Sequence, residues 1–157
     1  MPSKIVKEFL DKNNIKYVSI KHSRSFTAQE IAASAHIKGR KIAKTVVLKV
    51  GGKLIFTVLP ASYKIDFNML KESLDSETIR LANEQEFKDK CPGCEVGAMP
   101  PFGNLFNIET YVAASLVEDE EIAFNAGNHT ELIRMRYVDF EKLVKPKVLR
   151  FSNKYKT

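Results

Sequence analysis

The sequence has few of the residues that mark disulfide-rich, fibrous or membrane proteins. Its 157 residues include two cysteines, too few for a disulfide framework. Seven glycines and six prolines, with 44% apolar and 28% charged residues, exclude collagen-like repeats and disorder and fit a globular chain. No apolar run approaches the roughly 20 residues of a membrane-spanning helix. The first residues are amphipathic and lack the apolar stretch of a signal peptide, so we expect a cytoplasmic protein without membrane association.

Several common catalytic signatures are also missing. The sequence contains no GxSxG, P-loop, GxGxxG or HExxH motif. Cys91 and Cys94 have the spacing of a redox or metal motif, but no second CxxC completes a zinc site. A metal-free turn is favoured over redox or zinc chemistry, and we expect neither a metal nor a cofactor.

Negative charge is scarce in the first part of the chain. Residues 1–64 contain 13 lysines and arginines but only three acidic residues, a net charge of +10, whereas residues 65–157 carry a net charge of −4. Such a separation creates a positive field that raises encounter rates with a polyanion, for which nucleic acid is the natural candidate. A solvated lysine-rich surface without a partner is the alternative.

Helix and strand signals are interspersed without a regular βαβ rhythm. Helices are predicted near residues 3–13, 27–39, 66–74, 83–90 and 139–144, and strands near 15–20, 45–50, 53–59, 78–81, 108–113, 121–125 and 131–135. Because some strands pair as hairpins, we expect an α+β fold with a mixed, partly barrel-like β-sheet surrounded by helices. We also expect a single domain over residues 1–157, with a short basic C-terminal tail from about residue 146 that is frayed or touches phosphate.

The most unusual segment is a loop at residues 97–104 that is crowded with glycine and proline. Two consecutive prolines fix φ, and the glycines allow conformations closed to other residues. Such a stiff loop is expected to expose its backbone. The pre-oriented backbone N–H and C=O groups can then hold a polar ligand or an oxyanion. A simple turn is the alternative interpretation. The candidate substrate-binding residues here are Gly97, Ala98, Met99, Pro100, Pro101, Phe102 and Gly103.

Lys44 begins a predicted strand that is otherwise apolar and β-branched. Since side chains alternate between the faces of a strand, Lys44 shares a face with Val46 and Leu48, whereas Val47 lies on the other. A long cationic side chain on a mostly apolar face is a candidate for holding a phosphate or a polarised carbonyl oxygen. A lysine that points to solvent is the alternative.

A short turn between two predicted strands, at residues 126–130, carries Gly127 and His129. An imidazole at the tip of a turn is partly exposed and can hydrogen-bond a ligand or take up a proton near neutral pH. An incidental histidine is the alternative.

Three motifs stand in a fixed order along the chain. They are Lys-Thr-Val-Val at residues 44–47, Gly-x-x-x-Pro at 97–101 followed by Phe102-Gly103, and Ala-Gly-Asn-His at 126–129. In this order and at these separations they resemble the YbaK/prolyl-tRNA-synthetase-associated editing domain family, from the first helix to about residue 144. The resemblance implies an enzyme, an aminoacyl-tRNA deacylase that hydrolyses the ester bond of mischarged tRNA, in many members tRNA for proline.

The resemblance also implies roles for individual residues. Lys44 matches the family's essential lysine, which contacts the terminal adenosine or its phosphate and orients the ester. The backbone of residues 97–101 matches the loop that fixes the aminoacyl group and the attacking water. His129 stands where several members carry histidine, although others do not. The implied partners are tRNA and, in addition, a prolyl-tRNA synthetase.

The chemistry of the residues is compatible with this function. An aminoacyl ester is already activated, so positioning and oxyanion stabilisation suffice without a covalent nucleophile or metal. Selectivity for a small amino acid such as Ala, Ser, Thr or Cys would come from pocket size near Met99 and Phe102. Two alternatives stay open: a non-catalytic module that binds tRNA or a synthetase with the same pocket, and a thiol redox or zinc protein.

Overall fold

A computed structural model describes residues 2–23, 42–76, 78–90, 92–95 and 97–154. The helices are α1 (Pro2–Lys12), α3 (Phe67–Leu74), α4 (Glu84–Phe87), α5 (Ala114–Val117) and α6 (Tyr137–Val144), with a 3₁₀ helix η2 (Gly103–Phe106). The strands are β1 (Tyr17–Lys21), β2 (Ile42–Val50), β3 (Lys53–Pro60), β4 (Tyr63–Ile65), β5 (Ile79–Leu81), β6 (Glu109–Ala113), β7 (Glu121–Asn125), β8 (Glu131–Arg136), β9 (Lys147–Leu149) and β10 (Ser152–Lys154). The helix predicted at residues 27–39 lies outside the described residues.

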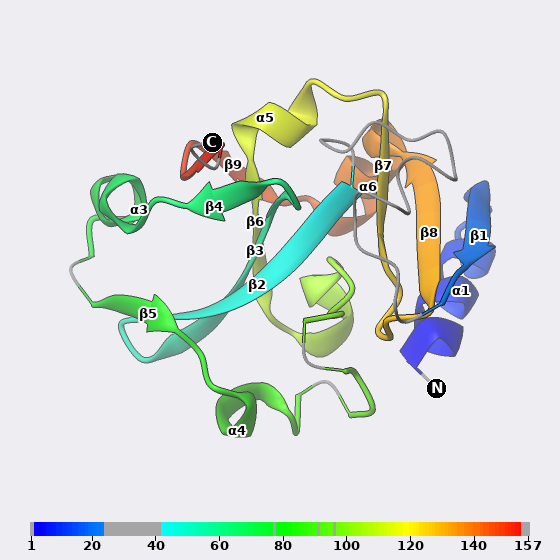
Figure 1. Ribbon diagram of the computed structural model, residues 1–157, viewed down its shortest axis with the longest axis horizontal. Helices are drawn as coiled ribbons and strands as arrows, with labels where there is room; N and C mark the ends of the chain where they lie inside the picture. Colours follow the sequence, from blue (N-terminus) through cyan, green and yellow to red (C-terminus); the bar gives the residue numbers. More distant parts are fainter. Residues whose placement is uncertain (1, 24–41, 77, 91, 96, 155–157) are drawn as a thin grey trace.

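The predicted α+β fold with a mixed sheet is confirmed (Figure 1). The strand order is β1-β8-β7-β2-β3-β6-β9, and β5 pairs with β2 as an eighth strand. The pairs β2–β7, β3–β6 and β6–β9 are parallel, whereas β1–β8, β7–β8, β2–β3 and β2–β5 are antiparallel. In Figure 1, α1 and β1 lie at the right of the molecule, α3 and β5 lie at the left, and α4 lies at the bottom. Among the described residues, no helix is long and apolar enough to cross a membrane.

Local sequence signals account for the central hairpin and two helix starts. Gly51 and Gly52, with φ of 55° and 85°, join β2 to β3 in the left-handed conformations that a tight hairpin turn requires. Asp66 caps α3 by accepting from the N–H groups of residues 68 and 69. Asn83 and Glu86 form a capping box at α4. These elements agree with their predictions from sequence.

The two faces of the central strands carry separate cores. On one face, Leu48 of β2 and Leu59 of β3 pack with Leu70 of α3. On the other face, Val58 of β3 packs with Phe102 of the glycine–proline loop and with residues of α1 and α6. Burying each of these side chains contributes roughly 1.5–3 kcal/mol. The central strands β2 and β3 therefore pack against a hydrophobic core on each face. This packing fixes the positions of the chain segments connected to them.

Within the basic C-terminal segment, residues 147–149 and 152–154 form strands, so this part of the expected tail is not frayed, and its contact with phosphate stays a prediction. β9 lies parallel to β6, and β10 pairs antiparallel with β4. Between them Phe151 is fully buried in the core that contains Leu48. The buried Phe151 side chain holds this segment against the core. The basic composition of the segment gives no indication that one of its residues is buried.

A buried ion pair ties α1 to the edge of the sheet. Glu131 of β8 is buried, and its carboxylate accepts from the Lys7 ammonium of α1 and the Ser19 hydroxyl of β1. Burial raises the pKa of Glu131, but these two donors outweigh that effect and hold the pKa below its usual value.

We expect this pair to lose its stabilising effect in acid. Because the folded-state pKa of Glu131 lies below the ordinary 4.5, the pair stabilises the fold above about pH 4.5, and the contribution is lost as the pH falls through the folded-state pKa. Glu131→Gln should lower the free energy of unfolding at neutral pH by roughly 1–3 kcal/mol. Urea unfolding of both proteins from pH 7 to pH 3 measures this difference. A difference that stays constant in acid would contradict the assignment.

Candidate functional site

Two segments that are distant in the sequence meet beyond the end of β7. The Glu95 N–H donates to the Gly127 carbonyl at 2.9 Å, and the His129 N–H donates to Glu95 Oε2 at 2.9 Å. The Ala98 N–H donates to the Glu95 carbonyl at 3.0 Å, which ties the start of the loop back to Glu95. Glu95 therefore joins the glycine–proline loop to the turn that carries His129.

Gly97 lies against the imidazole of His129. Its φ is +83°, and a Cβ added to it would lie 3.4 Å from His129 Cε1 and 3.7 Å from Nε2. Gly97 is exposed and His129 is half-buried. A larger residue here would combine a strained backbone with pressure on the ring, so the position favours glycine. The structure thus brings Gly97, Gly127 and His129 together, three of the residues singled out in the sequence.

Hydrogen bonds within the β7–β8 turn fix the place of His129. Asn128 Oδ1 accepts from the Thr130 N–H at 3.0 Å and from the Thr130 hydroxyl at 2.9 Å. The Ala126 N–H donates to the Glu131 carbonyl at 3.1 Å, which prolongs the β7–β8 pairing by one step. Such side-chain bonds to nearby backbone are the usual way that asparagine stabilises a turn.

The rest of the predicted substrate loop is buried, which corrects the expectation of a loop that shows its backbone. Met99 packs with Val47 and Phe56 in one core. Phe102 forms edge-on contacts with three aromatic rings, at centroid distances of 5.9, 5.3 and 5.7 Å. Residues 98–103 are all buried, and Gly97 is the exposed member of the run from 97 to 103. Met99 and Phe102 therefore support the loop from behind instead of lining an open pocket.

Lys44 is half-buried on β2, where it faces Leu59 of β3 across the hairpin. Strand alternation puts Lys44 on the face of Val46 and Leu48, as predicted, whereas Met99 of the loop packs on the face of Val47. Lys44 and the packed part of the loop thus approach β2 from opposite faces.

The backbone places Lys44 near the C-terminal end of β7. Ala43 pairs with Phe124, so Lys44 is one residue beyond the last β2–β7 pair. From Phe124 the chain runs three residues to Gly127, whose carbonyl accepts from Glu95. The motifs at 97–103 and 126–129 therefore meet beyond the C-terminal end of β7, and Lys44 lies near that end on the face of β2 opposite the packed part of the loop.

Part of the positive charge of residues 1–64 is neutralised by ion pairs. Lys49 Nζ lies 2.7 Å from Glu86 Oε2, and Arg80 binds both oxygens of the same carboxylate at 2.7 and 2.8 Å. Hydrogen bonds from Arg80 and then from Lys49 hold the pKa of Glu86 far below its usual value. The charge of Lys49 is therefore neutralised by Glu86 within the fold. The positive charge that can attract a polyanion is smaller than the count of lysines and arginines in the sequence indicates.

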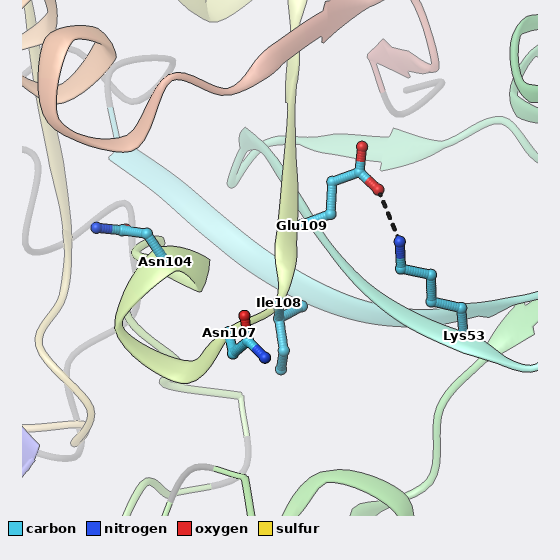
Figure 2. A pocket seen from close by; sticks show the side chains of 5 residues that line it. All are labelled: Lys53, Asn104, Asn107, Ile108 and Glu109. Carbon is cyan, nitrogen blue, oxygen red and sulfur yellow. Dashed lines mark hydrogen bonds and ion pairs between the residues drawn. The ribbon is translucent and has the colours of Figure 1, made fainter.

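Two surface hollows lie away from these motifs. One, of about 670 Å³, is lined by Lys53 and Glu109, whose charged groups are 3.4 Å apart, with Asn104, Asn107 and Ile108 (Figure 2). The other, of about 780 Å³, adjoins α3 and is lined by Asn68, Lys71, Glu72, Asp75 and Ser76. Neither contains a residue of the three motifs.

Cys94 is half-buried and packs against the core that contains Phe87 and Met99. Cys91 lies outside the described residues, and across the part of the chain that is described no three His, Cys, Asp or Glu side chains gather as a metal site would require. We expect a Cys91→Ser, Cys94→Ser double variant to keep the deacylation rate of the unmodified protein. Hydrolysis rates of the variant and of the unmodified protein, each measured with and without a chelator, test this expectation. A large loss of rate in the variant would favour the thiol redox or zinc protein instead.

The sequence profile of the aminoacyl-tRNA editing domain family matches residues 22–143, a stretch that includes all three motifs. The chain belongs to the aminoacyl-tRNA editing domain family. A curated relative is the Multifunctional Ser/Thr-tRNA deacylase ProXp-y of Escherichia coli K12, 28% identical over 127 residues that cover 76% of this chain and 75% of the relative. A Proline--tRNA ligase of Bacillus mycoides is 28% identical over 104 residues, which cover 64% of this chain and 18% of the ligase.

Solved structures share the fold of this editing domain. The crystal structure of a candidate trans-editing enzyme for prolyl tRNA synthetase superposes with a TM-score of 0.83 at 18% identity, over 97% of each chain. A hypothetical protein superposes with a TM-score of 0.81 at 22% identity, over 95% of this chain and 99% of the other. At these identities the likeness shows the fold alone.

Proposed function

We propose that this editing domain hydrolyses the ester bond of mischarged aminoacyl-tRNA, acting over residues 1–157 as a single domain. The observation that carries the proposal is the family match over residues 22–143, which contains Lys44, the loop at 97–103 and the turn at 126–129. The hydrogen bonds of Glu95 and the Gly97–His129 contact support it, because they join two of these motifs at one place.

The reaction needs little chemistry from the protein. Water attacks the ester carbonyl, negative charge develops on the carbonyl oxygen, and the ribose hydroxyl of the terminal adenosine leaves. Because the ester is activated, the main contributions are orientation of the water and ester and stabilisation of the oxyanion by positioned donors or a cation.

Each motif supplies one of these contributions. The Lys44 ammonium holds the terminal adenosine or its phosphate and orients the ester. The backbone at Gly97 faces the aminoacyl group, since the rest of the loop is buried and the Ala98 N–H is already bound to Glu95. His129, beside Gly97, borders the same space and can hydrogen-bond the substrate.

The proposed substrates carry a small amino acid. Among Ala, Ser, Thr and Cys, the relative in E. coli favours Ser and Thr. Relatives that are proline–tRNA ligases favour tRNA for proline and a prolyl-tRNA synthetase as partner. One methylene changes binding in such a pocket by only ~1–3 kcal/mol, so several small amino acids should be accepted.

A deacylation assay tests the proposal. The purified protein is incubated with tRNA for proline charged in turn with Ala, Ser, Thr, Cys and Pro, and release of the amino acid is followed. We expect rapid release of at least one small non-cognate amino acid and little release of proline. Salt-dependent binding of tRNA without release of any amino acid would favour the non-catalytic binding module instead.

A further inference from the structure

Glu95 belongs to none of the three sequence motifs, yet it lies where the two loop motifs meet. Its carboxylate accepts from the His129 N–H, and its own N–H donates to the Gly127 carbonyl. Its side chain is half-buried, and exposed Gly97 follows two residues later, against the His129 ring. A carboxylate is thereby placed beside the one exposed backbone position of the substrate loop.

Glu95 is also the one acidic residue in the sequence of the two segments 92–103 and 126–130. Glu131, which directly follows the second segment, binds Lys7 and Ser19 on the side of β8 that faces β1. A negative charge at this site is therefore supplied by Glu95, and its position is set by two hydrogen bonds to the partner segment.

The substrate of an editing deacylase brings a matching charge. An aminoacyl ester has a free α-amino group, which carries a proton at and below neutral pH. An ammonium that enters a half-buried site is unfavourable unless a counter-charge or strong acceptor meets it.

We propose that the Glu95 carboxylate binds the α-ammonium of the aminoacyl group and makes the enzyme select aminoacyl esters over esters without that charge. The inference rests on the proposed deacylase function. One oxygen of the carboxylate stays on the His129 N–H, and the ammonium is held by the carboxylate beside Gly97. A charge-assisted hydrogen bond of this kind corresponds to roughly 10- to 100-fold in affinity or rate.

Glu95→Gln separates this role from a purely structural one. The glutamine carbonyl oxygen can still accept from the His129 N–H, so the junction between the segments is kept while the negative charge is lost. Glu121→Gln is the matched control, because it makes the same change at the other end of β7, where Glu121 lies 3.6 Å from Arg134.

The experiment compares two substrates that differ only in the charge. One preparation of seryl-tRNA is used directly, and a second is deaminated with nitrous acid, which replaces the α-ammonium by a hydroxyl of similar size. Rates with each protein are divided by the spontaneous hydrolysis rate of the same ester. We expect the unmodified protein and Glu121→Gln to prefer the aminoacyl ester by about 10- to 100-fold, and Glu95→Gln to lose most of that preference.

The outcomes separate this inference from the proposed function. If the unmodified protein hydrolyses neither seryl ester and also releases no amino acid in the deacylation assay above, the deacylase function itself fails. If it hydrolyses the aminoacyl ester but Glu95→Gln keeps the same preference, or slows both esters equally, Glu95 only joins the two segments and the inference is overturned. Melting temperatures of the three proteins show whether a loss of rate reflects unfolding.

Discussion

Lys44→Ala is expected to lower the rate of aminoacyl-tRNA hydrolysis by about 100-fold, because losing the group that orients the ester misplaces it, and a misplacement of about 1 Å typically has an effect of this size. Lys44 lies one residue beyond the last β2–β7 pair, and the two loop motifs meet beyond the end of β7. Single-turnover hydrolysis of a tRNA that the unmodified protein deacylates measures the loss. The melting temperature should change little, since a half-buried lysine is not a core contact.

Lys53→Ala is the matched control for this prediction. Lys53 is exposed at the opposite end of the β2–β3 hairpin, where its ammonium lies 3.4 Å from Glu109. Its removal should leave the hydrolysis rate within a small factor of the unmodified protein. Undiminished hydrolysis by Lys44→Ala would remove Lys44 from the mechanism.

The second large effect concerns the fold that supports the site. Gly103, which begins η2, has no room for a side chain: an added Cβ would lie 2.2 Å from Thr110 Oγ1 and 2.3 Å from the Ile108 carbonyl oxygen. Backbone atoms cannot move aside cheaply, and the Ile108 N–H is itself bound to the Gly103 carbonyl at 2.8 Å. We expect Gly103→Ala to destabilise the protein by about 3 kcal/mol, the upper part of the usual range for overpacking.

Thermal unfolding measures this effect. For a protein of this length the expected loss corresponds to a fall in Tm of roughly 6–12 °C. Gly51→Asn is the control, because nothing lies within 4 Å of a Cβ at Gly51 and asparagine tolerates its φ of 55°. A Gly103→Ala variant as stable as Gly51→Asn would mean that the packing around η2 differs from that described.

Local signals in the sequence predicted most of the helices and strands. The cap at Asp66, the capping box at Asn83 and the Gly51-Gly52 turn each fix the chain through interactions between near neighbours. Such interactions are readable from spacing alone.

The missed elements are short, and partners distant in the sequence hold them. β4, β9 and β10 have three residues each, and α5 has four. No periodicity can be recognised over such lengths. β9 pairs with β6 and β10 pairs with β4, and neither pairing leaves a signal in the strand's own residues.

The candidate site was predicted in part for the same reason. Gly97 and His129 were singled out by their unusual local sequences, and the structure places them against each other; the face of Lys44 on β2 followed from strand alternation. The burial of Met99 and Phe102 depends on Val47, Phe124 and other residues far along the chain, so a rigid loop was mistaken for an open one. Glu95 was missed because a single acid carries no pattern. Its position as the lone acid of the two loop segments is the signal that could have revealed it.

The central claim is that Lys44 and the Gly97 backbone serve one aminoacyl site although they reach it from different faces of β2. A crystal structure with a non-hydrolysable 3′-serylamino adenosine tests this most directly. We expect one bound molecule in contact with both the Lys44 ammonium and the Gly97 backbone, next to His129. An analogue seated elsewhere, such as the hollow beside Lys53 and Asn104, or one that touches the loop but not Lys44, would contradict it.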